Sequence, residues 1–415
     1  MNLLTIATRK ARTAATLMKE GGWRSVTEEL LRKVGPTPPG PGIQTLVKWQ
    51  DAEAVDWTVP HPSLAHPHRV PEGPIHFAWI MSPPGRSGGG HHNIFRFISY
   101  LEQAGHTVSI HLYWHNDHAV SVPHIRDMLA ETPAYAKVNA PIWLYDGAAG
   151  VGPNVDAIVA TGWETAYPAF LDRSAAQRFY FVQDFEPDFY PTGTESVLAE
   201  NTYHFGFHGI TAGAWLQDRL RRDYGMNCDR FDFSADKQTY FVTNDAPRKE
   251  IFFYARPVTP RRAFELGVLA LEEFAKLRPD VTINLAGWDV SGYDLGFEFV
   301  DHADMDLDDL NELYNRCAAG LVLSLTNMSL LPLELMAAGV TPVVNDGANN
   351  TMVSANPNIR YVPLAPKALA RALSEVVDEY AEQSPARRIA DSLVDKDWSA
   401  SGRQMVQAME RVMRG

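Results

Sequence analysis

The most constraining feature of the sequence is a strand, loop and helix pattern late in the chain. Residues 321–325 and 340–344 are apolar runs of strand length. Between them, Ser329 is a good helix N-cap, Pro332 suits a first helical turn, and Gly339 suits a helix end. The pattern predicts the strand–helix–strand unit of an α/β fold.

The loop before this predicted helix is a candidate phosphate site. The first N–H groups of a helix have no internal partner and the positive end of its dipole lies there, so both attract an anion. Glu334 lies one turn further in, where its carboxylate could accept hydrogen bonds from a ribose hydroxyl. The same pattern occurs in α/β domains that bind nothing, and the local sequence leaves both interpretations open.

Length and composition indicate a two-domain globular protein. The chain has 415 residues, and 45% hydrophobic with 21% charged residues is an ordinary globular balance. A net charge of −13 argues against a general nucleic-acid binder. Cys228 and Cys317 lie far apart in the sequence, which favours a reduced compartment.

The N-terminal residues differ from the rest of the chain. Residues 1–33 hold seven Lys or Arg and three Glu, a net charge of +4. They predict a basic helical extension that either contacts anionic lipid or packs against the body of the protein, and residues 35–74 predict a proline-rich connection. Arg9 and Lys10 interrupt any signal-peptide core, and no apolar run is long enough to span a bilayer. We therefore expect a cytoplasmic protein, with contact to the inner face of the plasma membrane as a separate hypothesis.

A glycine-rich loop follows the first predicted strand, residues 75–81. The loop ends in Gly88, Gly89 and Gly90. Glycines let backbone N–H groups approach a ligand closely, although three in a row also suit a merely flexible loop. His91 and His92, at the mouth of this loop, are candidate polar contacts to substrate, whereas the scattered histidines give no convincing metal site.

Two later strand ends carry polar groups beside aromatic rings. Thr161, Trp163 and Glu164 follow the strand at 157–161, and Asp184 follows the strand at 179–183. Carboxylates accept hydrogen bonds from sugar hydroxyls and rings stack on sugar C–H faces, although an acidic surface loop is an equal alternative. Further strands are predicted at 108–114, 142–145, 209–211, 281–286 and 297–300, and helices at 214–224, 307–317, 366–382 and 399–413. Residues 225–248 are expected to be turns that bridge to a second domain.

Three arginines follow the first strand of the second half, residues 251–255. Arg256, Arg261 and Arg262 surround a strand-to-helix turn. Guanidinium groups are always charged and fork onto phosphate oxygens, so the turn is a candidate anion clamp. The alternative is a set of surface arginines paired with Glu265 or Glu272.

The order of these segments resembles glycosyltransferases of the GT-B fold, and more closely the retaining GT4 group and its bacterial rhamnosyltransferase branch, the WsaF-type enzymes. The segments that carry the resemblance are 160–165, 180–191, 253–257 and 324–350. It implies two Rossmann-like doubly wound domains that face each other across a cleft. Residues 1–74 would be the N-terminal extension, 75–240 the acceptor-binding domain, 241–398 the nucleotide-sugar-binding domain, and 399–415 a helix that packs back on the first domain.

The resemblance also implies a site. The arginines would neutralise the donor diphosphate, Ser329 and Leu330 would offer N–H groups, and Glu334 would hold the ribose. The donor-binding residues are then Arg256, Arg261, Arg262, Gly287, Thr326, Ser329, Leu330 and Glu334. The acceptor and cleft residues are Gly88, Gly89, Gly90, His91, His92, Thr161 and Trp163. The catalytic residues are Asp184 or Glu164, which would orient or deprotonate the acceptor, and Arg256. Enzymes of this kind need no metal, and no cofactor is expected beyond the nucleoside-diphosphate sugar, a dTDP-sugar being favoured.

One position departs from the family pattern. GT4 enzymes commonly carry a second glutamate eight residues before the ribose glutamate, and here that position is Thr326. The donor sugar is therefore open, and rhamnose or another deoxyhexose is compatible with the loss. The predicted function is transfer of such a sugar, with retention, to a growing cell-surface or lipid-linked glycan. The alternatives are a GT-B-like protein that binds nucleotide or glycan without transfer, and a sugar-nucleotide epimerase.

Overall fold

The computed structural model of the protein describes residues 45–86, 89–115, 120–303, 305 and 307–415. The basic extension expected at residues 1–33 lies outside these ranges. From Leu46 to Gly415 the chain forms one packed unit. Within the described ranges, no helix combines the length and the apolar character that crossing a bilayer requires.

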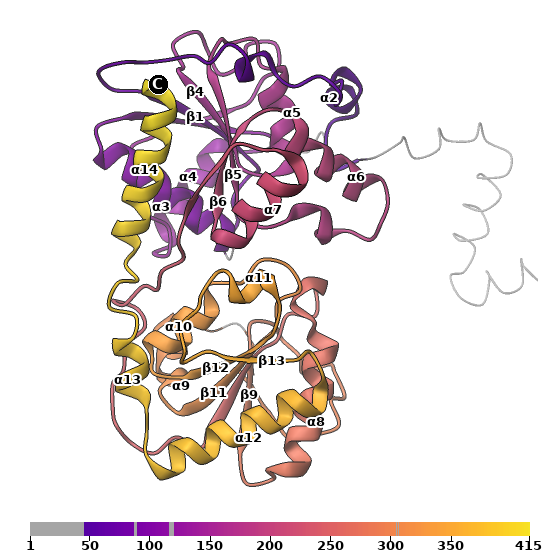
Figure 1. Ribbon diagram of the computed structural model, residues 1–415, viewed down its shortest axis with the longest axis vertical. Coiled ribbons are helices and arrows are strands. Elements are labelled where there is room, and N and C mark those ends of the chain that lie inside the picture. Colours follow the sequence, from indigo (N-terminus) through magenta and orange to yellow (C-terminus); the bar gives the residue numbers. More distant parts are fainter. Residues whose placement is uncertain (1–44, 87–88, 116–119, 304, 306) are drawn as a thin grey trace, which may run out of the picture. The chain divides into compact units, whose positions relative to one another are not determined.

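The first half of this unit is built on seven parallel strands in the order β3-β2-β1-β4-β5-β6-β7 (Figure 1). The strands are β1 (His76–Met81), β2 (Thr107–Leu112), β3 (Ile142–Leu144), β4 (Ala157–Ala160), β5 (Gln177–Val182), β6 (His208–Ala212) and β7 (Cys228–Phe231). The central strands are buried almost throughout, because crossover helices cover both faces of a parallel sheet.

Helices lie on both sides of this first sheet. Figure 1 shows α3 (Gly89–Gln103) and α4 (Val122–Glu131) on one side and α5 (Trp163–Leu171) and α7 (Ala214–Tyr224) on the other. The remaining elements of this half are α2 (Trp49–Ala54), α6 (Thr194–Asn201) and the 3-10 turns η1 (Pro62–Leu64), η2 (Glu186–Phe189) and η3 (Thr202–His204).

The second half repeats the plan with six parallel strands in the order β10-β9-β8-β11-β12-β13. The strands are β8 (Glu250–Tyr254), β9 (Thr282–Ala286), β10 (Val300–Asp301), β11 (Cys317–Val322), β12 (Thr341–Asn345) and β13 (Arg360–Val362). The helices are η4 (Pro260–Arg262), α8 (Phe264–Leu277), α9 (Leu307–Tyr314), α10 (Leu331–Ala337), α11 (Ala348–Thr351), α12 (Pro366–Glu382) and α13 (Ala386–Asp391). The α/β fold predicted from the sequence is confirmed.

Each sheet reverses its strand order beside its first strand. The reversal lies between β1 and β4 in the first sheet and between β8 and β11 in the second. Ligands of doubly wound sheets bind outside the carboxyl ends of the strands at such a switch point. The glycine loop, Glu164, Arg256 and the loop after β11 all follow these four strands, so the topology gathers the predicted site residues at the functional ends of the sheets.

Several elements differ from the sequence prediction. Residues 225–248 contain the strand β7, where only turns were expected, because charged Asp229 and Arg230 interrupt its buried ends. Strand β11 begins at Cys317, so the helix expected to reach that residue ends at Tyr314 instead. The segment Cys317–Val322 holds alanine and glycine, which favour strands weakly, and its complete burial decides its structure.

The last helix, α14 (Trp398–Arg414), follows the second sheet in sequence but packs on the first half. Gln404 Oε1 accepts a hydrogen bond of 3.0 Å from the Asp232 N–H, and the Met413 carbonyl accepts one of 2.8 Å from the Val70 N–H. The Arg96 guanidinium lies 4.2 Å from the Trp398 ring centroid. The chain therefore crosses twice between its halves.

Replacing Gly402 with alanine should loosen α14. The added Cβ would lie 2.3 Å from Tyr100 Cδ2, which is too close for any real contact. Overpacking costs about 1–3 kcal/mol, against about 1 kcal/mol gained in helix propensity, so we expect a net loss of up to about 2 kcal/mol in the free energy of unfolding measured with denaturant. As a control, Gln407→Ala at an exposed position of the same helix should change the free energy of unfolding by less than about 0.5 kcal/mol. A Gly402→Ala protein as stable as wild type would contradict this packing.

Candidate functional site

The two halves meet through the carboxylate of Asp184, which follows β5. Its Oδ2 accepts a hydrogen bond of 2.9 Å from Thr326 Oγ1, and its Oδ1 accepts one of 2.8 Å from the Asn327 N–H. The Phe185 N–H also donates to Oδ1, at 2.8 Å. Residues 324–330, which follow β11 and are called the donor loop below, are thus held against the end of β5.

Asn327 makes a second attachment between the halves. Its Nδ2 donates to the Gln183 carbonyl at 3.0 Å and to the Ala212 carbonyl at 2.8 Å. These carbonyls lie at the ends of β5 and β6, where the ladder no longer supplies a partner. This contact could not be predicted from the sequence, because an asparagine in a loop has many possible partners.

Asparagines from the neighbouring strand hold the other side of the donor loop. Ser324 donates its N–H to Asn345 Oδ1 at 2.8 Å, and its carbonyl accepts from Asn345 Nδ2 and Asn349 Nδ2, each at 2.9 Å. Asn350 Nδ2 donates to the Asn345 carbonyl at 2.8 Å. The polar end of the strand at 340–344 was visible in the sequence, and the structure shows that it shapes the loop.

Two of the three predicted arginines, Arg261 and Arg262, contact this loop, and Arg256 lies near Arg262. Arg262 Nη1 donates to Ser324 Oγ at 2.8 Å, and Arg256 Nη1 donates to the Gly287 carbonyl at 3.1 Å. Arg261 Nε lies 3.4 Å from Asp184 Oδ2. Burial lowers the pKa of Arg262, Asp184 raises it, and the nearby charges of Arg261 and Arg256 lower it further. The three arginines are therefore close enough for the charges of Arg256 and Arg261 to affect the pKa of Arg262.

Two buried donors at this place lack a hydrogen bond. Arg261 Nε has none of good geometry, despite the nearby Asp184 carboxylate, and Ser329 Oγ has none within the described part of the chain. Buried polar groups are normally satisfied. Phosphate oxygens are acceptors that would suit both donors.

Ser329 is not the N-cap that the sequence suggested. Helix α10 begins at Leu331, its N-cap is Leu330 with helical backbone angles of φ −69° and ψ −25°, and no side chain caps it. The helix has only seven residues. The donor loop therefore depends on its hydrogen-bonded side chains more than on a helix dipole.

Gly287 has a conformation that few other residues could adopt. Its φ is +110°, and a Cβ there would lie 2.5 Å from the Tyr254 ring. Glu334 lies in the first turn of α10 and is partly exposed. Burial raises the pKa of Glu334 to about 7, while Arg96 of α3 lowers it and Asp236 raises it. The pKa of Glu334 therefore depends on charged residues of the first half.

On the first half, Gly89, Gly90 and both histidines form the start of α3. Gly89 begins α3, the Gly90 carbonyl accepts from Gln183 Nε2 at 3.1 Å, and Gly88 lies outside the described residues. His91 Nε2 lies 3.0 Å from the Ser82 carbonyl, and the His92 ring meets the Tyr135 ring edge-on at 4.4 Å. Burial lowers the pKa of both histidines.

Trp163 is packed inside the protein rather than open to a sugar. It is 2% exposed, and its indole N–H donates to Tyr190 Oη at 3.0 Å. Thr161 Oγ1 donates to the Ile80 carbonyl at 2.9 Å. Of this group, Glu164 is the partly exposed carboxylate, and burial raises its pKa.

A buried carboxyl beside Glu164 was not singled out from the sequence. Glu186 is 6% exposed, and its Oε2 accepts from the Trp163 N–H and the Tyr180 hydroxyl, each at 2.6 Å. Burial first, and then the charge of Glu164, raises the pKa of Glu186 to about 8. It belongs to the acidic segment after β5, where its burial could not be read from the sequence.

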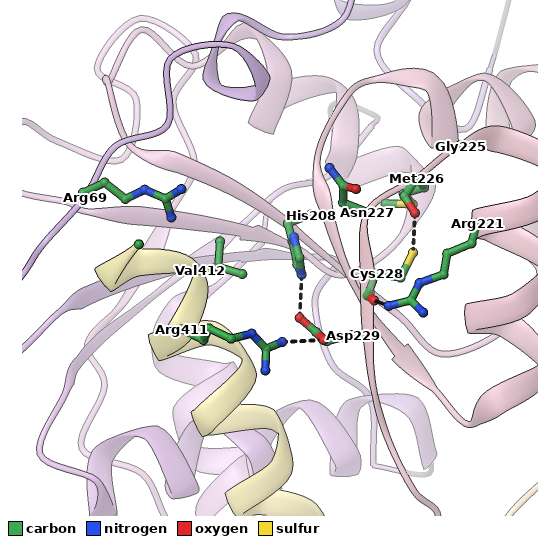
Figure 2. Close-up of a pocket in the computed structure, with 11 residues that line it drawn as sticks. Arg69, His208, Arg221, Gly225, Met226, Asn227, Cys228, Asp229, Arg411 and Val412 are labelled. Atoms are coloured by element: carbon green, nitrogen blue, oxygen red, sulfur yellow. Dashed lines mark hydrogen bonds and ion pairs between the residues drawn. The ribbon is translucent and has the colours of Figure 1, made fainter.

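Two cavities lie away from this network. One of about 660 Å³ lies at the amino ends of β6 and β7, opposite the ends that carry Asp184 and Asn327's partners. Figure 2 shows His208 and Arg411 directed at Asp229 there, at 2.9 and 2.5 Å. A second of about 550 Å³ is lined by Tyr240 and Arg387 among others. Neither contains a predicted site residue, so the polar network guides the assignment. Among the described residues no cluster of His, Cys, Asp or Glu is arranged to hold a metal.

The fold and site together define a class of protein. Two sheets with the same strand order, joined at the carboxyl ends of their strands, form the GT-B arrangement. Staphylococcus aureus TarM, in a complex with UDP and glycan ligands, has a TM-score of 0.65 at 9% identity over 82% of this chain and 100% of its own. Anabaena HepE, in complex with UDP and glucose, has a TM-score of 0.60 at 15% identity over 81% and 100%. At these identities the likeness shows the fold alone.

Within that fold, the chain is WsaF-like. The family model described as the WsaF N-terminal domain matches residues 148–212, and the WsaF C-terminal domain matches residues 249–374. The resemblance to WsaF-type proteins is confirmed, whereas membership of the GT4 group stays a prediction. O-antigen biosynthesis protein RfbC of Myxococcus xanthus is 31% identical over 346 residues, which are 81% of this chain and 26% of that relative. The chain thus spans about a quarter of the relative's length.

The buried carboxyl of Glu186 should make stability depend on pH. Its folded pKa of about 8 lies above the value of 4.5 for a free carboxyl, so the folded protein binds more protons in that window. The contribution of Glu186 to the free energy of unfolding should therefore be greatest below about pH 4.5 and should decrease as the pH rises towards 8. In Glu186→Gln the amide oxygen still accepts both hydrogen bonds, so the free energy of unfolding should fall less from about pH 5 to about pH 8. Denaturant titrations would measure it, with the exposed Glu382→Gln as control. Equal pH slopes in wild type and Glu186→Gln would contradict the assignment.

Proposed function

We propose that the protein is a glycosyltransferase that moves a sugar from a nucleoside-diphosphate donor to a cell-surface glycan. The observation that carries the proposal is the grouping of Arg256, Arg261 and Arg262 near the donor loop, where Arg261 Nε and Ser329 Oγ are buried donors without a hydrogen bond in the described residues. The WsaF domains and the O-antigen biosynthesis relative support it, as do the UDP complexes of the similar folds.

The arginines would act on the leaving group. In the transfer, the acceptor oxygen bonds to the anomeric carbon, the bond from that carbon to the diphosphate breaks, and the acceptor proton passes to a diphosphate oxygen. Negative charge grows on the diphosphate as it leaves. Fixed guanidinium and N–H donors stabilise that charge most in the transition state, which is the requirement for catalysis. No metal is part of this proposal.

Glu334 would hold the ribose. Its pKa of about 7 leaves the carboxyl partly protonated near neutral pH, so it can accept from one hydroxyl or donate to another. Thr326, at the position of the missing glutamate, already uses its hydroxyl on Asp184. The donor sugar would therefore be read without that glutamate, which suits rhamnose or another deoxyhexose carried by dTDP.

Glu164 is the better candidate for contact with the acceptor. Both oxygens of Asp184 are occupied by donors, whereas Glu164 stands in the first turn of α5 at the end of β4 and is partly exposed. Attack from the face of the leaving group would retain the anomeric configuration. We propose retention on the family resemblance.

Arg256→Ala should slow transfer while leaving the fold intact. Removing one donor aimed at developing charge typically lowers kcat about 10²–10³-fold. The rate of nucleoside-diphosphate release in the presence of acceptor measures it. The exposed Arg371 of α12, changed to alanine, is the matched control and should keep the wild-type rate. Near-normal turnover in Arg256→Ala would remove Arg256 from the site.

Donor identity can be tested by ligand stabilisation. A ligand that binds only the folded state raises the free energy of unfolding, by about 2.7 kcal/mol at a concentration of 100 times its Kd, and therefore raises Tm. We expect dTDP-rhamnose to raise the wild-type Tm more than UDP-glucose does, and to raise that of Arg256→Ala less. Incubation of the same donors with and without glycan then separates the functions. Release of diphosphate only with acceptor supports transfer, a changed sugar without acceptor supports an epimerase, and binding alone supports a non-catalytic protein.

A further inference from the structure

We infer that Asp184 is a positioning residue that ties the donor loop to the first domain, so that the loop holds its binding shape only while the two domains are in contact. The inference rests on the proposed function, because it concerns the loop assigned to the donor. It gives Asp184 a different role from the acceptor base that the sequence suggested.

The surroundings of Asp184 account for this role. The residue is 8% exposed, and each carboxylate oxygen accepts a hydrogen bond from the donor loop. Hydrogen bonds to a charged acceptor are roughly twice as strong as those between neutral groups. In a buried site, water screens them less. Two consecutive loop residues, Thr326 and Asn327, are thereby fixed to the end of a strand in the other domain.

The Asn327 side chain completes the attachment. Its amide donates to main-chain carbonyls at the ends of two adjacent strands, so it cannot shift along either one without losing a bond. Asn327 is 1% exposed. A separation of the domains would break these hydrogen bonds together and release the donor loop from the first domain.

The same contacts connect Asp184 to the phosphate site. Arg261 faces both Asp184 Oδ2 and the other arginines, and its carbonyl accepts from the Leu325 N–H at 3.0 Å. Loss of the Asp184 charge would free Arg261 and the loop together. A general base instead needs an oxygen within reach of the acceptor hydroxyl, and both oxygens of Asp184 already accept from the protein.

Amide hydrogen exchange tests the attachment without any ligand. In Asp184→Asn and in Asn327→Ala, peptides that contain residues 324–330 should exchange about tenfold faster than in wild type, because a lost buried hydrogen bond to a charge favours opening by that order. Asp188→Asn makes the same chemical change nearby. Asp188 lies on η2 and is paired with Arg219 at 3.5 Å, so this variant should leave the donor loop unchanged. Unchanged exchange of the loop in Asp184→Asn would overturn the inference.

Kinetics separate positioning from base catalysis. We expect Asp184→Asn and Thr326→Val each to raise the donor KM about tenfold, with a smaller effect on kcat and an unchanged acid limb of the pH–rate profile. The double variant should be little worse than Asp184→Asn alone, because Thr326→Val removes a contact that Asp184→Asn already weakens. A collapse of kcat and loss of the acid limb in Asp184→Asn alone would make Asp184 the base and refute positioning. If the wild-type protein transfers no sugar to any acceptor, the proposed function fails, and the exchange result still decides the role of Asp184.

Discussion

The buried hydrogen bonds between Asp184 and the loop after β11 set the geometry on which the site depends. They join the carboxyl ends of two parallel sheets, where each sheet has its switch point. Parallel strands leave carbonyl groups without ladder partners at these ends, and Asn327 supplies donors to two of them. The loop therefore donates hydrogen bonds to the first domain, and its Ser324 hydroxyl accepts one from Arg262 of the second.

The site divides into two electrostatic environments. On the second domain, Arg256 and Arg261 lie near Arg262, and Arg261 and Arg262 are near the Asp184 carboxylate of the first domain, which gives a local group of positive charges in a chain whose net charge is −13. On the first domain, burial raises the pKa of both Glu164 and Glu186, and the charge of Glu164 raises the pKa of Glu186 further. The second domain therefore contributes fixed positive charge, whereas the first contributes carboxyls whose raised pKa favours the neutral form.

The residue types at the strand ends were easier to predict from the sequence than the bounds of the strands and helices. Arginines after one strand and carboxylates after others were readable, because parallel sheets bring strand ends together whatever the loops do. The strand β7 and the early start of β11 were not, since burial by neighbouring elements overrides weak local propensity. Trp163 was a candidate cleft residue, yet it is 2% exposed and its indole N–H donates to Tyr190 Oη.

The sequence by itself determined the α/β alternation, the two halves and the residue types at the ends of the strands, because these follow from short-range hydrophobic patterns and turn residues. Only the tertiary structure decided which of those residues bond to one another. Asp184 forms a contact between the domains, Ser329 does not cap α10 and its hydroxyl has no hydrogen bond among the described residues, and Glu186 is buried with a raised pKa. The physical reason is that hydrogen bonds and pKa shifts depend on distances between segments far apart in the chain, which no local pattern encodes.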